Sequence, residues 1–237
     1  MYKHDLLTHN LESPRQVLPL ILKKLNIKSI CDVGCGIGSW LKVASDLGIN
    51  EFVGIDGDYI DKDMILVPTN NIIFADLNKV ELIPINRKFD LVISLEVAEH
   101  LPKENAHSFV NFLTQLGDIV LFSAAIYNQG GQNHLNEQWP NYWNEIFEKN
   151  DYVLLDIIRF NFWDNKNVQW WYKQNMFLAV KKSIKDNVIN MWQPENDFSP
   201  KAIVHPEQFL FYTEALNSIK NKDNYLRKIL KALHICH

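Results

Sequence analysis

Four residues near the middle of the chain have side chains of the types that transfer protons near neutral pH. Glu96, Glu99 and His100 stand at positions i, i+3 and i+4, and His134 follows in a later segment. On one helical turn the first three side chains would lie on a common face. Carboxylates and imidazoles are frequent general acids and bases. We therefore take Glu99, His100 and His134 as candidate catalytic residues.

A second set of residues would allow a ligand to come close to the backbone. Gly34, Gly36 and Gly38 directly follow the apolar run 29–33. Glycine lets the chain turn tightly and leaves space that a side chain would fill. A dinucleotide-binding turn has its third glycine one place later, where Ser39 stands, so the spacing departs from that fingerprint. The simpler alternative is a strand-to-helix turn without a ligand.

These residues need a framework that holds them together, and the hydrophobic pattern predicts one. It predicts strands at 29–33, 51–55, 71–75, 89–95, 119–125, 152–158 and 175–181, with helices at 13–25, 39–47, 102–116 and 137–149 between them. This alternation predicts an α/β fold with a seven-stranded, mostly parallel, doubly wound sheet. Loops after neighbouring parallel strands meet at the carboxyl edge, where ligands bind. His134 is therefore expected near His100.

The pattern also predicts how the chain is divided. Residues 1–182 are expected to form one domain that contains the sheet. Residues 183–237 are expected to form a helical C-terminal extension, with helices at 206–219 and 224–233.

The run Asp32-Val33-Gly34-Cys35-Gly36-Ile37-Gly38 is similar to the first motif of class I, Rossmann-like methyltransferases. Other acids stand where that family has them: Asp56 closes the second predicted strand, and Asp76-Leu77 closes the third. The resemblance covers about residues 13 to 182, with sequence-based boundaries good to ~2–4 residues. It implies an enzyme that transfers a methyl group from S-adenosylmethionine.

The resemblance also implies roles in cofactor binding. The glycine turn would hold the methionine part, and Asp56 would accept hydrogen bonds from the ribose hydroxyls. Asp76 would accept from the adenine amino group, the Leu77 amide would donate to a ring nitrogen, and Arg15 would pair with the cofactor carboxylate. The full set of cofactor-binding residues expected from it is Arg15, Asp32, Gly34, Cys35, Gly36, Gly38, Asp56, Gly57, Asp76, Leu77 and Glu96.

The Glu-x-x-Glu-His sequence at 96–100, followed by His134, resembles the metal cluster of small-RNA 2′-O-methyltransferases, and its first part resembles ubiquinone-pathway O-methyltransferases. On that analogy Glu96, Glu99, His100 and His134 would hold a divalent ion such as Mg or Mn. A hydroxyl acceptor needs such an ion, or a base, to lose its proton. Methyltransferases that need no metal also carry a Glu-His pair here, which then only shapes the pocket.

The acceptor is less well defined by the sequence. Aromatic residues are concentrated between the fifth and seventh predicted strands, and aromatic faces stack on sugars and other rings. We expect O-methylation of a small molecule or carbohydrate, such as a nucleotide-linked sugar or a surface glycan precursor. The alternatives are a metal-dependent RNA 2′-O-methyltransferase and a non-catalytic cofactor-binding protein. The sequence does not predict the oligomeric state.

Composition limits the partners and the location. The chain of 237 residues has a formal net charge of −4, which disfavours nucleic acid as a partner. Its three cysteines, Cys31, Cys35 and Cys236, lack metal-ligand spacing. With no apolar run long enough for a signal peptide or a membrane span, the sequence predicts a cytoplasmic protein.

Overall fold

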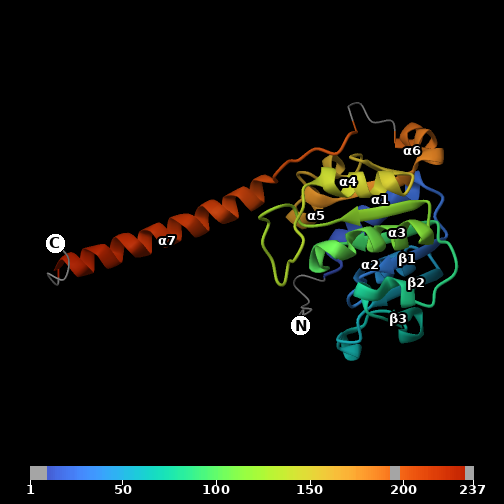
Figure 1. Cartoon of the computed structure of the whole chain (residues 1–237), viewed down its shortest axis with the longest axis horizontal. Helices are drawn as coiled ribbons and strands as arrows, with labels where there is room; N and C mark the ends of the chain where they lie inside the picture. Colours follow the sequence, from blue (N-terminus) through green and yellow to red (C-terminus); the bar gives the residue numbers. More distant parts are fainter. Residues whose placement is uncertain (1–9, 193–197, 233–237) are drawn as a thin grey trace. The chain divides into compact units, whose positions relative to one another are not determined.

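The computed structural model describes residues 10–192 and 198–232, except for the side chains of residues 221–232. The chain forms two compact units, Met1–Ala202 and Ile203–His237. The strands, all in the first unit, are β1 (Ser29–Val33), β2 (Glu51–Asp56), β3 (Ile72–Phe74), β4 (Leu91–Leu95), β5 (Ile119–Ser123), β6 (Tyr152–Leu155) and β7 (Phe177–Lys181). The helices of this unit are α1 (Glu12–Lys24), α2 (Ser39–Asp46), α3 (Ala106–Leu116), α4 (Pro140–Lys149), α5 (Trp170–Asn175) and α6 (Lys185–Trp192). The second unit contains α7 (Pro206–Ala232), and all these elements are drawn in Figure 1.

The strands form one sheet in the order β3-β2-β1-β4-β5-β7-β6. Neighbouring strands are parallel except that β7 runs antiparallel to β5 and to β6. The expected seven-stranded, mostly parallel α/β sheet is therefore confirmed. Because β1 lies between β2 and β4 and is parallel to both, the loops that follow these three strands emerge side by side at one edge.

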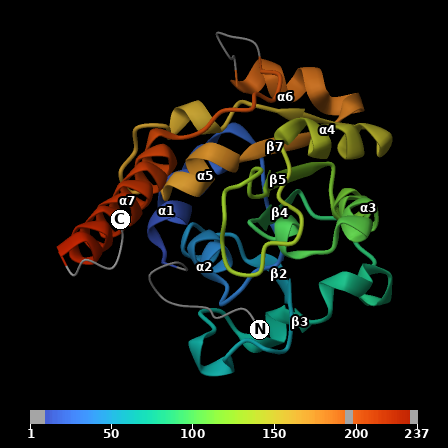
Figure 2. The ribbon, with the colours of Figure 1, turned by 60° about the vertical axis from the view of Figure 1, so that its left-hand side comes forward.

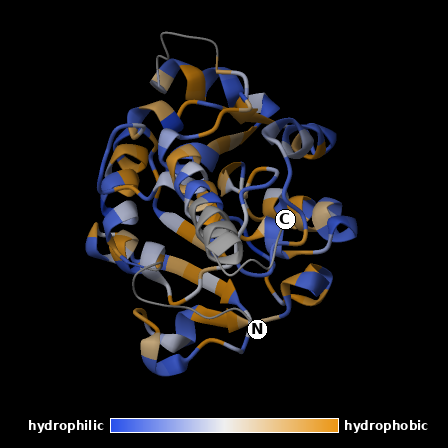
Figure 3. Cartoon of the chain, turned by 90° about the vertical axis from the view of Figure 1, so that its left-hand side faces the viewer, coloured by the Kyte–Doolittle hydropathy of each residue, from blue (hydrophilic) through white to orange (hydrophobic). Residues whose placement is uncertain are grey.

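Helices cover both faces of the sheet, with α1 and α2 on one side and α3 on the other (Figure 2). Buried residues of α1 and α2, such as Leu18 and Leu41, pack with one face, and those of α3 and α4, such as Phe109 and Phe147, with the other. β1 and β4 are buried along their whole length, and the strands are mainly hydrophobic in Figure 3. Strands covered on both faces carry such continuous apolar runs, and this rigid centre positions the loops at its edge.

Several sequence-based boundaries were wrong. α4 begins at Pro140, not at Glu137, because proline suits the first helical position and the Gln138 amide donates to Ala125 O instead. β5, β6 and β7 are shorter than expected, and α5 and α6 were not predicted.

The two helices expected at 206–219 and 224–233 are one helix, α7 (Pro206–Ala232). The residues between them, 220–223, are Lys, Asn, Lys and Asp, which include no helix-breaking proline or glycine. Residue 233 lies outside the described residues, as does Cys236.

None of the helices described for residues 10–192 and 198–232 combines the length and the apolar character that a membrane span requires.

Candidate functional site

The turn after β1 is built from glycines in the left-handed backbone region. Gly34, Gly36 and Gly38 have φ values of 82°, 53° and 82°. A β-carbon at Gly34 would lie 2.2 Å from a methyl carbon of Val97, so no other residue fits there without displacing the loop after β4. The Gly34 amide donates to Ile55 O at 2.8 Å, which fixes the turn against β2. The glycines thus bring three loops into close contact.

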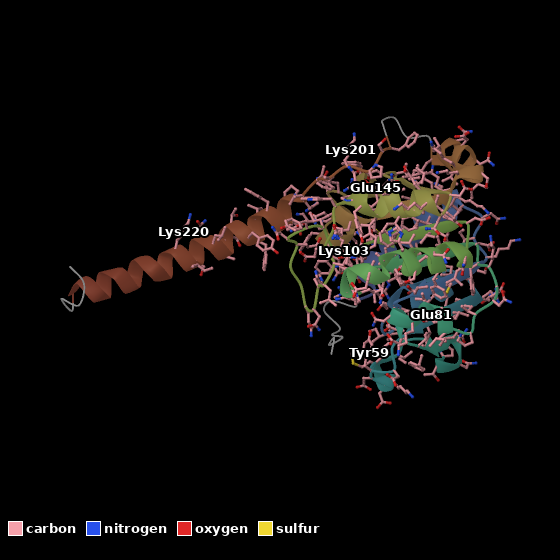
Figure 4. The ribbon with its side chains drawn as sticks, viewed as in Figure 1. Tyr59, Glu81, Lys103, Glu145, Lys201 and Lys220 are labelled. Atoms are coloured by element: carbon pink, nitrogen blue, oxygen red, sulfur yellow. The ribbon has the colours of Figure 1, made fainter. Side chains whose placement is uncertain are left out.

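Asp56, the last residue of β2, connects its own loop with the glycine turn. Its side chain is only 3% exposed, and Oδ2 accepts a 2.7 Å hydrogen bond from the Gly36 amide. Oδ1 accepts from the Gly57 amide at 2.6 Å and from the Tyr59 hydroxyl at 2.7 Å. Tyr59 is half exposed on the segment after β2 (Figure 4). The carboxylate expected to bind ribose is thus oriented by three donors, and one of them is the hydroxyl of the partly exposed Tyr59.

Asp32 and Cys35 lie beside this carboxylate in the interior. Asp32 is 2% exposed, and its Oδ2 has no hydrogen-bond partner among the described residues. Burial, and secondly the charge of Asp56, raises the pKa of Asp32 well above its usual range. Burial likewise raises the pKa of the Cys35 thiol. Asp32 therefore keeps a polar atom available deep in the turn.

The structure places the other expected cofactor residues outside this buried group. Asp76 is exposed and caps the short 3-10 helix that begins at Leu77, with Oδ1 accepting from the Asn78 amide at 2.9 Å. This hydrogen bond is the main reason that the pKa of Asp76 is lowered. Arg15, in the first turn of α1, is exposed and pairs with Glu12 at 3.2 Å. Their roles toward a ligand stay predictions.

The sequence predicted that Glu96 begins a helical turn. In the structure it directly follows β4 and does not begin one. Its φ is 56°, outside the helical region, because its amide bonds to Ser123 O at 3.1 Å and to Ser123 Oγ at 3.0 Å. Its carboxylate accepts from Asn175 Nδ2 at 3.1 and 3.3 Å and from Gln129 Nε2 at 3.3 Å. Burial raises the pKa of Glu96, against the opposing effect of these hydrogen bonds.

Glu99, His100 and His134 come together although they lie on two loops. Each offers a ligand atom, and these atoms all lie within 4.8 Å of one another. The two imidazole rings are 4.8 Å apart between centroids, edge to face. Glu99 is fully buried: Oε1 accepts from the Ala125 amide at 3.1 Å, and Oε2 has no partner in the described part of the chain. Burial, and secondly the charge of Glu96, raises the pKa of Glu99 well above its usual range.

Sequence reasoning missed the amide side chains that surround Glu96. Gln129 Oε1 accepts from Gln174 Nε2 at 3.0 Å, from Asn175 Nδ2 at 2.9 Å and from the Ile126 amide at 3.2 Å. Gln129, Gln174 and Asn175 are all buried. Gln129 and the adjacent pair Gln174 and Asn175 come from two segments far apart in the chain, and no local pattern marks them. Buried amides with several partners hold a neighbouring carboxylate in place.

The fold agrees with comparisons to known proteins. A family profile described as a methyltransferase domain matches residues 6–180. No curated protein matches the sequence.

Solved structures resemble the fold at low sequence identity. The magnesium protoporphyrin IX methyltransferase of Synechocystis PCC 6803, with bound S-adenosylhomocysteine, superposes with a TM-score of 0.51 at 15% identity, covering 76% of this chain and 90% of that one. The methyltransferase domain of bacterial CtHen1-C has a TM-score of 0.52 at 19% identity, covering 73% and 99%. DesVI of Streptomyces venezuelae has a TM-score of 0.53 at 11% identity, covering 76% and 100%. At these identities the likeness concerns the fold.

Proposed function

The chain belongs to the methyltransferase domain family and is an S-adenosylmethionine-dependent methyltransferase of class I. We propose that it methylates a hydroxyl oxygen of a small molecule or carbohydrate. The observation that carries this proposal is the cluster of Glu99, His100 and His134 at the carboxyl edge of the sheet. The glycine turn and Asp56, which follow the neighbouring strands β1 and β2, are the proposed cofactor site.

Methyl transfer from a sulfonium to an alcohol is an in-line displacement. The new bond joins the acceptor oxygen to the methyl carbon, the bond from that carbon to sulfur breaks, and the hydroxyl proton must leave. Alignment of donor and acceptor can lower most of the barrier. The proton requires an acceptor group on the protein, and we assign this to Nε2 of His134. Its other ring nitrogen, Nδ1, already lies 2.8 Å from Glu137 Oε1.

The same cluster fits a divalent cation. Glu99 Oε2 is a buried oxygen with no partner among the described residues. His100 and His134 supply nitrogen ligand atoms within 4.8 Å of a Glu99 carboxylate oxygen and of each other. Mixed carboxylate and imidazole donors suit Mg, Mn, Fe or Zn. Glu99 and His100 would hold the ion, with Glu96 beside them. His134 has one nitrogen not facing Glu137, Nε2, which would either complete the ligand set or act as the base, but not both at once. Bound there, the ion would favour loss of the hydroxyl proton by its charge.

The loop that carries His134 favours a neutral acceptor. Residues 124–139 contain no Lys or Arg, and their only acid, Glu137, faces His134. Two aromatic side chains near the ends of this loop are solvent-accessible: Tyr127 is 58% and Trp139 39% exposed. Exposed aromatic rings beside uncharged amides are typical of surfaces that stack on sugars. A phosphate-rich acceptor would require cations for binding.

RNA 2′-O-methylation is the second candidate. It is favoured by the same cluster, since Glu-x-x-Glu-His followed by a later His resembles the metal site of small-RNA methyltransferases. The net charge of −4 and the absence of Lys and Arg from the loop oppose it. The two candidates differ in their salt dependence, because RNA affinity falls steeply as salt increases.

The test is transfer of a labelled methyl group from S-adenosylmethionine to nucleotide sugars, free oligosaccharides and short RNAs, with and without chelator. We expect label on a sugar hydroxyl, lost in chelator and restored by Mn²⁺. His134→Ala should abolish transfer, whereas His107→Ala, an exposed histidine on α3, should not. Full turnover in chelator would remove the ion from the mechanism, and label only on RNA would favour the second candidate. Failure to bind S-adenosylhomocysteine would contradict the proposal as a whole.

A further inference from the structure

The loop between β5 and α4 is held at its base by backbone hydrogen bonds. The amides of Leu135 and Asn136 both donate to Glu99 O, at 2.7 and 2.9 Å. The Gln138 amide donates to Ala125 O at 3.2 Å and thereby closes the loop where it leaves the sheet. His134 therefore stands directly before a segment that is fixed to the loop after β4. Only the side chain of His134 is left to be oriented.

Glu137 faces the side chain of His134 from within the same loop. Its Oε1 lies 2.8 Å from His134 Nδ1 and accepts a 2.7 Å hydrogen bond from the Gly130 amide. The two side chains are 12% and 16% exposed, so water has little access to this contact. A carboxylate has no proton to donate, so the proton in this hydrogen bond belongs to Nδ1 of the imidazole.

The imidazole of His134 is confined from two further sides. A β-carbon at Gly131 would lie 2.3 Å from Cε1 and Nε2 of the ring, so the glycine allows the ring to lie against the backbone. The His100 ring packs edge to face against it at 4.8 Å. In the part of the chain that the structure describes, the charged and titratable groups that face His134 are Glu137 on its own loop and Glu96, Glu99 and His100 on the loop after β4.

We propose that Glu137 is a positioning residue that keeps the proton of His134 on Nδ1 and thereby leaves the lone pair of Nε2 available to the acceptor hydroxyl or to a metal ion. This inference rests on the proposed function of the cluster. When Nε2 takes the proton of the acceptor, the imidazole becomes a cation, and the Glu137 carboxylate on Nδ1 stabilises that charge. A histidine without such a partner distributes its proton between both nitrogens.

The direct test is the tautomer of His134, read from ¹H–¹⁵N correlations of the imidazole nitrogens in the purified full chain. We expect the Nδ1–H form in the wild type and a shift toward the Nε2–H form in Glu137→Ala. Turnover of Glu137→Ala should fall about 10- to 100-fold, as for loss of other groups that orient a metal ligand or base. Glu145→Gln, an exposed acid on α4 (Figure 4), is the matched control and should change neither the tautomer nor turnover.

The tautomer readout separates this inference from the function on which it rests. A wild-type Nε2–H form, or an unchanged Nδ1–H form in Glu137→Ala, would overturn the positioning role whatever the acceptor is. Absence of methyl transfer with the expected tautomers would instead count against the proposed function. Should Glu137→Ala lose S-adenosylhomocysteine binding because the loop unfolds, Glu137→Gln replaces it. A neutral amide should then give a mixed tautomer population with lower turnover, and an unmixed Nδ1–H form with full turnover would overturn the role.

Discussion

Replacing Asp56 tests the cofactor site most directly. The buried carboxylate accepts from the Gly36 amide on Oδ2 and from the Gly57 amide and the Tyr59 hydroxyl on Oδ1. In our proposal the ribose hydroxyls take the place of the tyrosine hydroxyl, while the backbone donors remain. A hydrogen bond to a charged group contributes ~1.5–3 kcal/mol. Asp56→Ala should therefore weaken binding of S-adenosylhomocysteine about 10- to 150-fold.

Asp56→Asn should weaken binding as well, although it keeps the size of the side chain. Whichever way the amide turns, its NH₂ group faces the amide of Gly36 or of Gly57, so one donor opposes another. Leaving a buried donor without an acceptor costs ~1–3 kcal/mol, which lowers Tm by a few degrees in a protein of this size. Asp58→Asn, an exposed acid two residues later, is the control.

The measurement is calorimetric titration of each purified variant with S-adenosylhomocysteine, which binds without turning over, alongside thermal unfolding. If folded Asp56→Asn binds S-adenosylhomocysteine within twofold of the wild-type affinity, the proposed role of the Asp56 carboxylate in binding ribose is refuted. Loss of binding in Asp58→Asn as well would show that the loop, rather than the carboxylate, carries the effect.

Three further predictions concern single side chains. Burial raises the pKa of Glu99, so the folded state holds the carboxyl proton more tightly than the unfolded state does, and the wild type loses stability as pH rises above the usual Glu range. Glu99→Gln should abolish methyl transfer, yet its Tm should exceed that of the wild type by a difference that grows from about pH 5 to pH 8. A Tm difference that stays constant with pH would contradict this. Tyr59→Phe removes a hydroxyl that competes for Asp56 and should raise S-adenosylhomocysteine affinity about 2- to 10-fold, whereas weaker binding would mean that Tyr59 contacts the ligand. Gly34→Ala should lower the free energy of unfolding, measured in urea, by about 2–4 kcal/mol. Gly48 is also at positive φ, but a β-carbon there would have no atom within 4 Å, so Gly48→Ala should lower it by only about 1 kcal/mol. Equal losses would show that the clash with Val97 contributes nothing.

The parts of the fold and site that the sequence predicted are those encoded locally. The positions of Gly34 and Asp56 at strand ends could be predicted because each directly follows an apolar run, and such an end is visible in a few consecutive residues. The meeting of His100 and His134 was predicted from topology, since loops after adjacent parallel strands share an edge. The structure confirms that meeting, with the two rings 4.8 Å apart.

The parts that were missed depend on contacts between distant segments. Glu96 was expected on a helical turn, but its conformation follows from bonds to Ser123 and Asn175, neither of which is close to it in the chain. Glu137 was assigned to α4 because its neighbours have helical periodicity. In the structure its carboxylate instead bonds to the Gly130 amide and contacts His134, both within the loop before the helix. Local propensity cannot anticipate such contacts.

Asp56 and Glu99 each join two loops in addition to their proposed roles toward ligands. Asp56 connects the loop after β2 to the Gly36 amide in the turn after β1. Glu99 connects the loop after β4 to the segment after β5, through its side chain to the Ala125 amide and through its backbone oxygen to Leu135. Both carboxylates are buried and oriented by backbone donors, so the chain's own hydrogen bonds arrange this edge, which is the condition for effective alignment of donor and acceptor. It follows that alanine substitutions at these two positions remove a chemical group and a structural connection together. Measuring binding, turnover and stability separately for the amide substitutions can distinguish the loss of the chemical group from the loss of the structural connection.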